Sequence, residues 1–176
     1  MTKLIEKISE LITNKKVLIL GFGMEGQSTY KLLKEINPQL KITVADINPP
    51  QDFVDNDVVF IEDYNDCLND FDIIIKSPGI VLEKNPKEYS SVFTSQTELF
   101  LELYRNRVIG ITGTKGKSTV ATLLYHVLST NNVPCLIAGN IGIPVFDIIR
   151  DIKEDTTIVY ELSCHQLEYS EYSPST

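Results

Sequence analysis

The sequence predicts an α/β fold built on parallel sheets, and three observations carry this prediction. Short apolar runs alternate with stretches of helical periodicity along the whole chain, which is the pattern of strands joined by helices. Several runs are continuously apolar, as is typical of strands buried on both faces. Two runs open into glycine-rich loops at residues 21–26 and 110–119, each followed by a helical stretch. We therefore expect a Rossmann-like parallel-sheet unit followed by the start of a second α/β unit of the P-loop type.

In the first part of the chain, the expected elements follow one another at short intervals. Leu4, Ile8, Leu11 and Ile12 recur at helical spacing. The expected helices are residues 3–13, 28–36 and 97–104, and the expected strands are residues 17–20, 41–45, 58–61 and 72–75. The last of these strands runs into Ser77-Pro78-Gly79, where proline and glycine impose a turn.

The pattern of strand, loop and helix begins again near residue 107. The expected strands are residues 108–112, 134–138 and 157–162, and the expected helices are residues 118–130 and 143–150. We therefore divide the chain into two units, residues 1–106 and 107–176. Three strands make a sheet too small to bury a full core, so we expect the chain to be a fragment of a longer protein.

The charge and cysteine content exclude several classes of protein. With 16 basic and 24 acidic residues, the formal net charge is −8, which disfavours nucleic acid as a partner. No segment approaches the roughly 18 apolar residues of a membrane span, and the N-terminus lacks the apolar core of a secretory signal. The 3 cysteines form no metal or disulfide pattern. We expect a cytoplasmic protein in a reducing compartment, with no membrane partner.

The first glycine-rich loop has the spacing of a phosphate cradle. Gly21 permits a tight turn, Gly23 allows an anion to approach the backbone, and Gly26 lets helix and strand pack closely. The helix that follows would offer free N–H groups to a phosphate. Asp46 lies 20 residues after Gly26, where an acidic group contacts a ribose or a base. A turn needed only for packing is the alternative, and the motif alone does not distinguish a nicotinamide dinucleotide from another diphosphate.

The second loop predicts a binding site for a triphosphate. Backbone N–H groups from Gly113 to Lys117 can surround the phosphates, and Lys117 adds a positive charge. Ser118 offers its hydroxyl to Mg²⁺. The loop departs from a strict P-loop because Ile111 stands where the first glycine belongs. The candidate ATP-binding residues are Gly113, Thr114, Lys115, Gly116, Lys117, Ser118 and Thr119.

Glu161 is a candidate magnesium ligand at the end of the last expected strand. The carboxyl ends of parallel strands face the phosphate crevice in nucleotide-binding sheets, and Mg²⁺ prefers oxygen ligands. A solvated glutamate at a strand end is the alternative.

Four further blocks stand beside the two loops in a fixed order along the chain. Together the six blocks are Gly21–Gly26, Lys76-Ser-Pro-Gly-Ile80, Thr97-Glu-Leu-Phe100, Gly110–Thr119, Gly139-Asn-Ile-Gly-Ile-Pro144 and Glu161-Leu-Ser-Cys-His-Gln-Leu-Glu168. This set resembles the Mur ligases, ATP-dependent amide-forming enzymes that build the peptide stem of bacterial cell-wall precursors. The serine after Lys117 and the last two blocks make it most similar to the D-glutamate-adding member of the family.

The resemblance implies that the first unit binds UDP and the second binds ATP. The residues implied for the UDP substrate are Gly23, Met24, Glu25, Gly26, Asp46, Ser77, Gly79, Asn140 and Gln166. Asp46 would accept a hydrogen bond from the uracil ring, and Asn140 and Gln166 would contact the sugar-phosphate region and the magnesium shell. Lys117 and Glu161 would be catalytic, with Ser118 and Glu161 as ligands of Mg²⁺.

The implied reaction uses ATP to phosphorylate the L-alanine carboxylate of UDP-N-acetylmuramoyl-L-alanine. The amine of D-glutamate then attacks the acyl phosphate. This chemistry needs neutralised charge and aligned groups more than a protein nucleophile. Because the family's remaining strands and its C-terminal domain have no counterpart here, we expect this chain alone not to turn over.

Two other functions stay open at this point. A dinucleotide-binding oxidoreductase module would use residues 21–26 and Asp46, but it leaves residues 110–119 unexplained. A non-catalytic nucleotide-binding protein would keep both loops without the chemistry.

Overall fold

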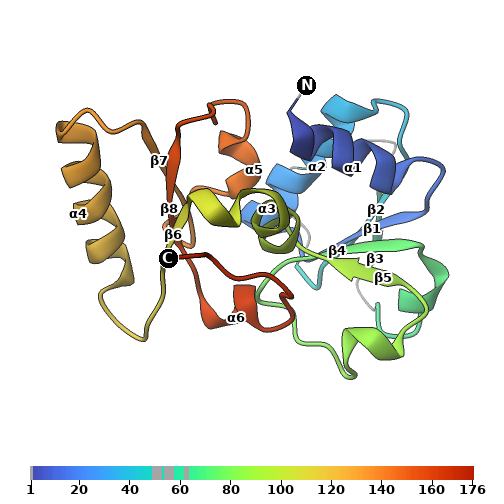
Figure 1. Ribbon diagram of the computed structural model, residues 1–176. Helices are drawn as coiled ribbons and strands as arrows, with labels where there is room; N and C mark the ends of the chain where they lie inside the picture. Colours follow the sequence, from blue (N-terminus) through green and yellow to red (C-terminus); the bar gives the residue numbers. More distant parts are fainter. Residues whose placement is uncertain (1, 49–52, 54–57, 62–63) are drawn as a thin grey trace. The chain divides into compact units, whose positions relative to one another are not determined.

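The computed structural model describes residues 2–48, 53, 58–61 and 64–176, and it confirms the predicted α/β class. The chain divides into two compact units, Lys3–Gln96 and Thr97–Thr176. Each unit contains one sheet, and the neighbouring strands within each sheet are parallel (Figure 1). None of the helices in the described ranges is long and apolar enough to cross a membrane.

The first unit is built on a five-stranded sheet in the order β3-β2-β1-β4-β5. Its strands are β1 (Val17–Leu20), β2 (Ile42–Ala45), β3 (Val58–Ile61), β4 (Ile73–Lys76) and β5 (Val92–Thr94). All residues of the central strand β1 are buried, as its uninterrupted apolar run predicts. Leu20 at the end of β1 pairs with Ala45 of β2 and with Lys76 of β4. The segments that follow these three strands therefore leave the sheet at one edge.

The α-helices α1 and α2 lie within the described part of the first unit. In α1 (Lys3–Ile12), three of the four apolar positions predicted from helical spacing are buried, and Leu11 is partly exposed. The second helix, α2 (Met24–Ile36), starts earlier than the predicted Ser28. Glycine at position 26 accounts for this early start, because its missing side chain lets the first turn pack directly on the preceding loop. The helix ends where Asn37 adopts an extended conformation, as predicted before Pro38.

Strand β5 was not predicted from the sequence. It has only three residues, and Val92 at its start is exposed. Pairing with β4 holds it in place, with Val92 opposite Ile73. A segment this short carries no readable periodicity, so only the tertiary pairing defines it.

The second unit is built on a three-stranded sheet in the order β6-β8-β7. Its strands are β6 (Val108–Ile111), β7 (Cys135–Gly139) and β8 (Thr157–Glu161). Its helices are α3 (Gln96–Tyr104), α4 (Lys117–Thr130), α5 (Val145–Ile148) and α6 (Cys164–Leu167). The three predicted strands are confirmed. The predicted helix 143–150 is shorter in the structure, and the four-residue helix α6 was not predicted.

Helix α4 packs against β7 and β8 (Figure 1). Within α4, Ala121 is fully buried, whereas Val120, Leu123 and Val127 are about half exposed. No Asp, Glu, Lys or Arg occurs between Lys117 and Asp147. The outward side of α4 is therefore an uncharged, partly apolar surface.

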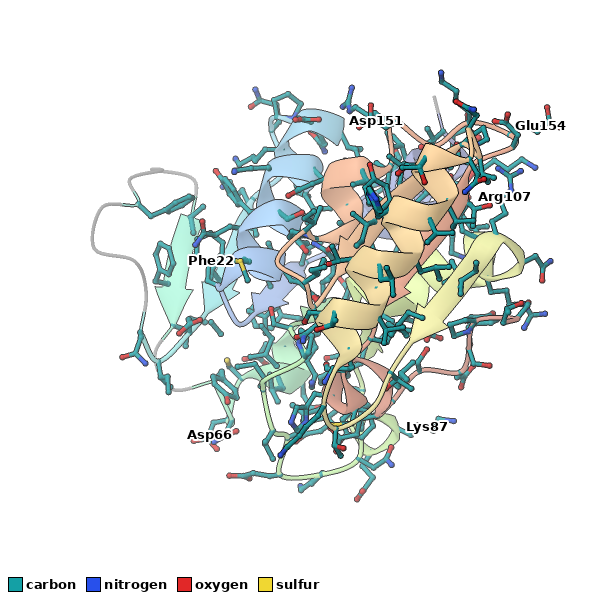
Figure 2. The ribbon with its side chains drawn as sticks, turned by 90° about the vertical axis from the view of Figure 1, so that its left-hand side faces the viewer. Phe22, Asp66, Lys87, Arg107, Asp151 and Glu154 are labelled. Carbon is teal, nitrogen blue, oxygen red and sulfur yellow. The ribbon has the colours of Figure 1, made fainter. Side chains whose placement is uncertain are left out.

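The division between the units falls after Gln96, the first residue of α3, whereas the sequence places the boundary after residue 106. The Phe100 ring of α3 packs edge-on against the Tyr160 ring of β8, with ring centroids 5.7 Å apart. This packing groups α3 with the second sheet. Arg107, labelled in Figure 2, donates from Nη1 to the Lys153 carbonyl over 2.9 Å and ties the start of β6 to the loop before β8. The binding roles predicted for the two units stay predictions.

Candidate active site

The first glycine-rich loop joins β1 to α2, and two of its glycines have no room for a side chain. Gly21 has a φ of 90°, and a Cβ there would lie 2.8 Å from the Ser77 Cβ. A Cβ at Gly26 would lie 2.1 Å from the Gly21 carbonyl oxygen. Around Gly23, by contrast, no atom lies within 4 Å of the Cβ position. Gly21 and Gly26 therefore shape the loop, and Gly23 leaves open space beside the backbone.

The start of α2 is suited to an anion. Its N-cap is Gly23, which has no side chain to cap the helix. The first N–H groups of a helix have no partner within the helix. Together with the helix dipole, such N–H groups favour a negative charge. Met24 is exposed, and Glu25 uses its carbonyl to accept hydrogen bonds from Thr29 and Gln96, each 2.8 Å long.

Asp46 fixes this loop to the end of β2. Its carboxylate accepts one hydrogen bond from the Phe22 N–H over 2.6 Å and another from the Asn48 N–H over 2.7 Å. A carboxylate has about four acceptor positions, so these two bonds leave capacity for a ligand. The predicted binding residue thus has a structural task that its spacing from Gly26 did not reveal.

Ser77 and Gly79 lie in the turn after β4, on the same edge of the sheet. The Ser77 hydroxyl donates to the Gly21 carbonyl over 2.9 Å, while a Cβ at Gly79 would meet nothing within 4 Å. Lys76 is almost fully buried, and its ammonium donates to the carbonyls of Ser77 and Pro78. The sequence signal for this buried cation was a lysine directly after three isoleucines.

An aromatic cluster supports the same loop, and sequence reasoning missed it. The Phe22 ring makes edge contacts with Tyr30, Phe53 and Phe60, at centroid distances of 6.0, 4.9 and 5.7 Å. Phe22 is labelled in Figure 2 and is 2% exposed. Its position between two glycines was the only hint in the sequence. The cluster anchors the loop from the side of β3.

The second loop leaves β6 and enters α4 through two glycines with positive φ. Gly113 has a φ of 145° and Gly116 a φ of 77°, and Gly116 caps α4 without a side-chain bond. The Lys117 ammonium donates to the Gly113 carbonyl over 2.8 Å and so closes the loop on itself. The remaining predicted members, Thr114, Lys115, Ser118 and Thr119, are exposed. The loop therefore presents backbone N–H groups, hydroxyls and lysines to solvent, as a triphosphate site requires.

Glu161 lies at the same edge of the second sheet. It ends β8 directly opposite Ile111 of β6, from which the loop departs. Its side chain is 1% exposed, and Oε1 accepts a hydrogen bond from the Asn140 amide over 3.1 Å. Within the described part of the chain, Oε2 is buried and has no hydrogen-bond partner. A buried carboxylate oxygen without a partner is costly unless another group satisfies it.

A magnesium ion fits this arrangement when phosphate is present. Among residues 2–48, 53, 58–61 and 64–176, no group of three or more His, Cys, Asp or Glu side chains could hold a metal. Mg²⁺ commonly takes one carboxylate and completes its shell with water and substrate phosphates. Glu161 Oε2 could supply that carboxylate oxygen, and Ser118, in the loop that follows the neighbouring strand β6, carries an exposed hydroxyl.

Gln166 has a structural task in α6. Its side-chain carbonyl accepts from the Ser163 N–H over 2.8 Å, and its own N–H donates to the Ser163 hydroxyl over 3.3 Å, which forms a capping box. Its predicted contact with substrate stays a prediction. Cys135 in β7 is half-buried, and burial raises the pKa of its thiol, which suits packing better than nucleophilic chemistry.

Comparison with known proteins finds relatives along almost the whole chain. No family model matches it. UDP-N-acetylmuramoylalanine–D-glutamate ligase of Clostridium botulinum (strain Kyoto / Type A2) is 33% identical over 181 residues, which cover 96% of this chain and 39% of that protein. The chain is a homologue of the Mur ligases. The enzyme of the same name from Oenococcus oeni is 34% identical over 158 residues, covering 88% of this chain and 35% of the relative.

This homology confirms the resemblance predicted from the six blocks. The chain spans about two fifths of the length of the curated ligases it matches. A crystal structure of UDP-N-acetylmuramate:L-alanyl-gamma-D-glutamyl-meso-diaminopimelate ligase from Neisseria meningitides covers 84% of this Mur-ligase homologue and 52% of the solved chain, at 14% identity and a TM-score of 0.46.

Proposed function

We propose that this chain supplies the UDP-substrate-binding and ATP-binding parts of a ligase that joins D-glutamate to UDP-N-acetylmuramoyl-L-alanine in the cytoplasm. One observation carries the proposal. The buried Glu161 carboxylate, with Oε2 lacking a hydrogen-bond partner among the described residues, ends the strand beside the Gly110–Thr119 loop. A dinucleotide-binding oxidoreductase module has no use for this second site.

The residues of the second unit have separable tasks in this proposal. When bound, ATP would supply the phosphoryl group that activates a carboxylate, and Mg²⁺ would neutralise phosphate charge. The Lys117 ammonium donates a hydrogen bond to the Gly113 carbonyl. It would exchange this carbonyl for a phosphate oxygen. Asn140 holds Glu161 Oε1, which leaves Oε2 and the Ser118 hydroxyl for the ion.

The residues of the first unit would bind the UDP part of the substrate. The open backbone at Gly23 and the N-terminal turn of α2 would hold the diphosphate. Ser77 and Gly79 lie in the turn that contacts Gly21, and would secure the ribose. Asp46 would use its remaining acceptor capacity for the uracil ring.

Calorimetric titration tests the two halves of the proposal separately. The chain is titrated with UDP-N-acetylmuramoyl-L-alanine, with NADH, and with the non-hydrolysable analogue AMP-PNP in the presence and absence of Mg²⁺. We expect binding of the UDP compound and Mg²⁺-dependent binding of AMP-PNP, with no binding of NADH. NADH binding without the UDP compound would instead support the oxidoreductase module.

Two variants give this titration its controls. Glu161→Gln removes the carboxylate charge but keeps the side-chain shape, so Mg²⁺-dependent AMP-PNP binding should weaken at least ten-fold, a decrease typical of lost metal contacts. Its affinity for the UDP compound should not change. Lys153→Ala removes an exposed lysine of the same unit that lies outside the loop and should leave both affinities unchanged. Equal weakening in both variants would contradict a specific site at Glu161.

A further inference from the structure

Tyr160 immediately precedes Glu161 in β8, and it is fixed on two sides. Its side chain is 1% exposed, and its hydroxyl lies 2.9 Å from the hydroxyl of Thr97, which is itself fully buried. Thr97 belongs to α3, 63 residues earlier in the chain. The ring packs edge-on against Phe100 of the same helix. One helix therefore holds both the ring and the hydroxyl of this tyrosine.

The Tyr160 ring also lies close to Gly139, the residue that precedes Asn140. Gly139 ends β7 with a φ of 104°, and a Cβ there would lie 2.5 Å from two atoms of the Tyr160 ring. The same Cβ would lie 2.1 Å from the Glu161 carbonyl oxygen. That carbonyl accepts the backbone N–H of Asn140 over 2.9 Å. The Tyr160 ring and the Glu161 carbonyl thus lie close against Gly139, directly before Asn140.

We propose that Tyr160, held through its hydroxyl by Thr97, is a positioning residue for the Asn140–Glu161 pair. The inference rests on the proposed function in one respect, namely that this pair serves a magnesium-bound nucleotide. A hydroxyl-to-hydroxyl bond is directional, so it sets where β8 lies along α3 in a way that apolar packing alone does not. Glu161 follows in the next position of the strand, and its 3.1 Å bond from Asn140 depends on the relative placement of β7 and β8.

Removing both hydroxyls separates positioning from folding. A single change, Tyr160→Phe or Thr97→Val, breaks the bond between these two buried hydroxyls and destabilises the unit. The double variant T97V/Y160F replaces both partners by apolar groups of similar shape, which is close to neutral for stability. It should therefore unfold near the wild-type temperature, while the orientation of β8 loses its directional restraint.

Two readouts test the role in the double variant. The first is the Mg²⁺-dependent increase in AMP-PNP affinity, which we expect to fall about ten-fold, the size of effect seen when groups that orient metal ligands are removed. AMP-PNP affinity without Mg²⁺ should stay unchanged. The second readout needs no ligand, and it is the NMR signal of the Asn140 side-chain amide, which should move when its bond to Glu161 is altered. The single variant Thr97→Ser keeps Tyr160 and a hydroxyl at position 97. Both readouts should therefore be closer to wild type than in the double variant.

Tyr172→Phe is the matched control, since Tyr172 belongs to the same unit and stacks under Arg105 at 5.8 Å. It should leave both readouts unchanged. A folded double variant with a wild-type Asn140 signal would overturn the proposal, and Tyr160 would then be a packing residue only. If wild-type protein shows no Mg²⁺-dependent AMP-PNP binding, the proposed function fails, while the Asn140 signal still decides whether Tyr160 positions the pair.

Discussion

Gly26 and Gly23 belong to one motif but differ in what surrounds them. Replacement of Gly26 by Ala would place a Cβ 2.1 Å from the Gly21 carbonyl oxygen, so the turn or α2 must move. We expect Gly26→Ala to lower the free energy of unfolding by about 3 kcal/mol or more, as strained or overpacked sites do. Gly23→Ala meets open space and should cost less than about 1 kcal/mol. Urea denaturation of both variants measures the difference, and equal losses would contradict it.

The three cysteines should differ in reactivity. Burial raises the pKa of Cys135, so less of its thiolate forms at any given pH, and alkylation needs the thiolate. Cys164 is exposed and should react first with iodoacetamide at pH 8. The rate at Cys135 should keep rising as the pH increases beyond the ordinary range for a thiol. Peptide mapping by mass spectrometry after timed alkylation gives the order, and faster labelling of Cys135 would show that β7 opens in solution.

At the scale of single residues, the sequence predicts the roles of glycines better than the hydrogen-bond partners of side chains. The spacing of Gly21 and Gly26 indicates their roles because a tight turn and a close approach are local requirements. The Phe22 N–H bond to Asp46 and the Tyr160–Thr97 bond could not be predicted, since each joins segments far apart in the chain. Glu161 was found because strand ends in parallel sheets share an edge.

Among the elements, α4 offers a direct test of burial. Leu123 is 60% exposed and Ala121 is fully buried on the same helix. We expect Leu123→Lys to change the free energy of unfolding by less than about 0.5 kcal/mol, as surface substitutions do. Ala121→Lys places a charge in the interface with β7 and β8 and should prevent folding or cost several kcal/mol. Thermal unfolding followed by circular dichroism distinguishes the two, and a large loss for Leu123→Lys would mean that this side of α4 is covered in solution.

The elements that were predicted share a clear local pattern, and those that were missed do not. The strands β1, β4 and β8 are continuous apolar runs that end in polar or glycine residues. The missed elements β5 and α6 have three and four residues, which is too short for periodicity. The cap formed by Ser163 and Gln166 defines α6, and its sequence signal was present but was interpreted as a binding block.

For the whole molecule, the net charge of −8 sets the expected behaviour toward polyanions. Long-range repulsion opposes any non-specific attraction to nucleic acid, whose binding depends on neutralising phosphates. We expect no shift of a labelled DNA duplex in a gel assay at physiological salt. Retention of the duplex would point to a concentrated basic surface that outweighs the total charge.

The contrast between crowded and open glycines also bears on how such a loop can change over evolutionary time. Gly21 and Gly26 exclude every side chain, so random substitution there removes the fold together with the ligand. Gly23 faces open space and Met24 is 66% exposed, so changes there alter what the loop touches without altering how it folds. Sequence drift in related chains can therefore retune ligand preference at these two positions while the scaffold is inherited unchanged.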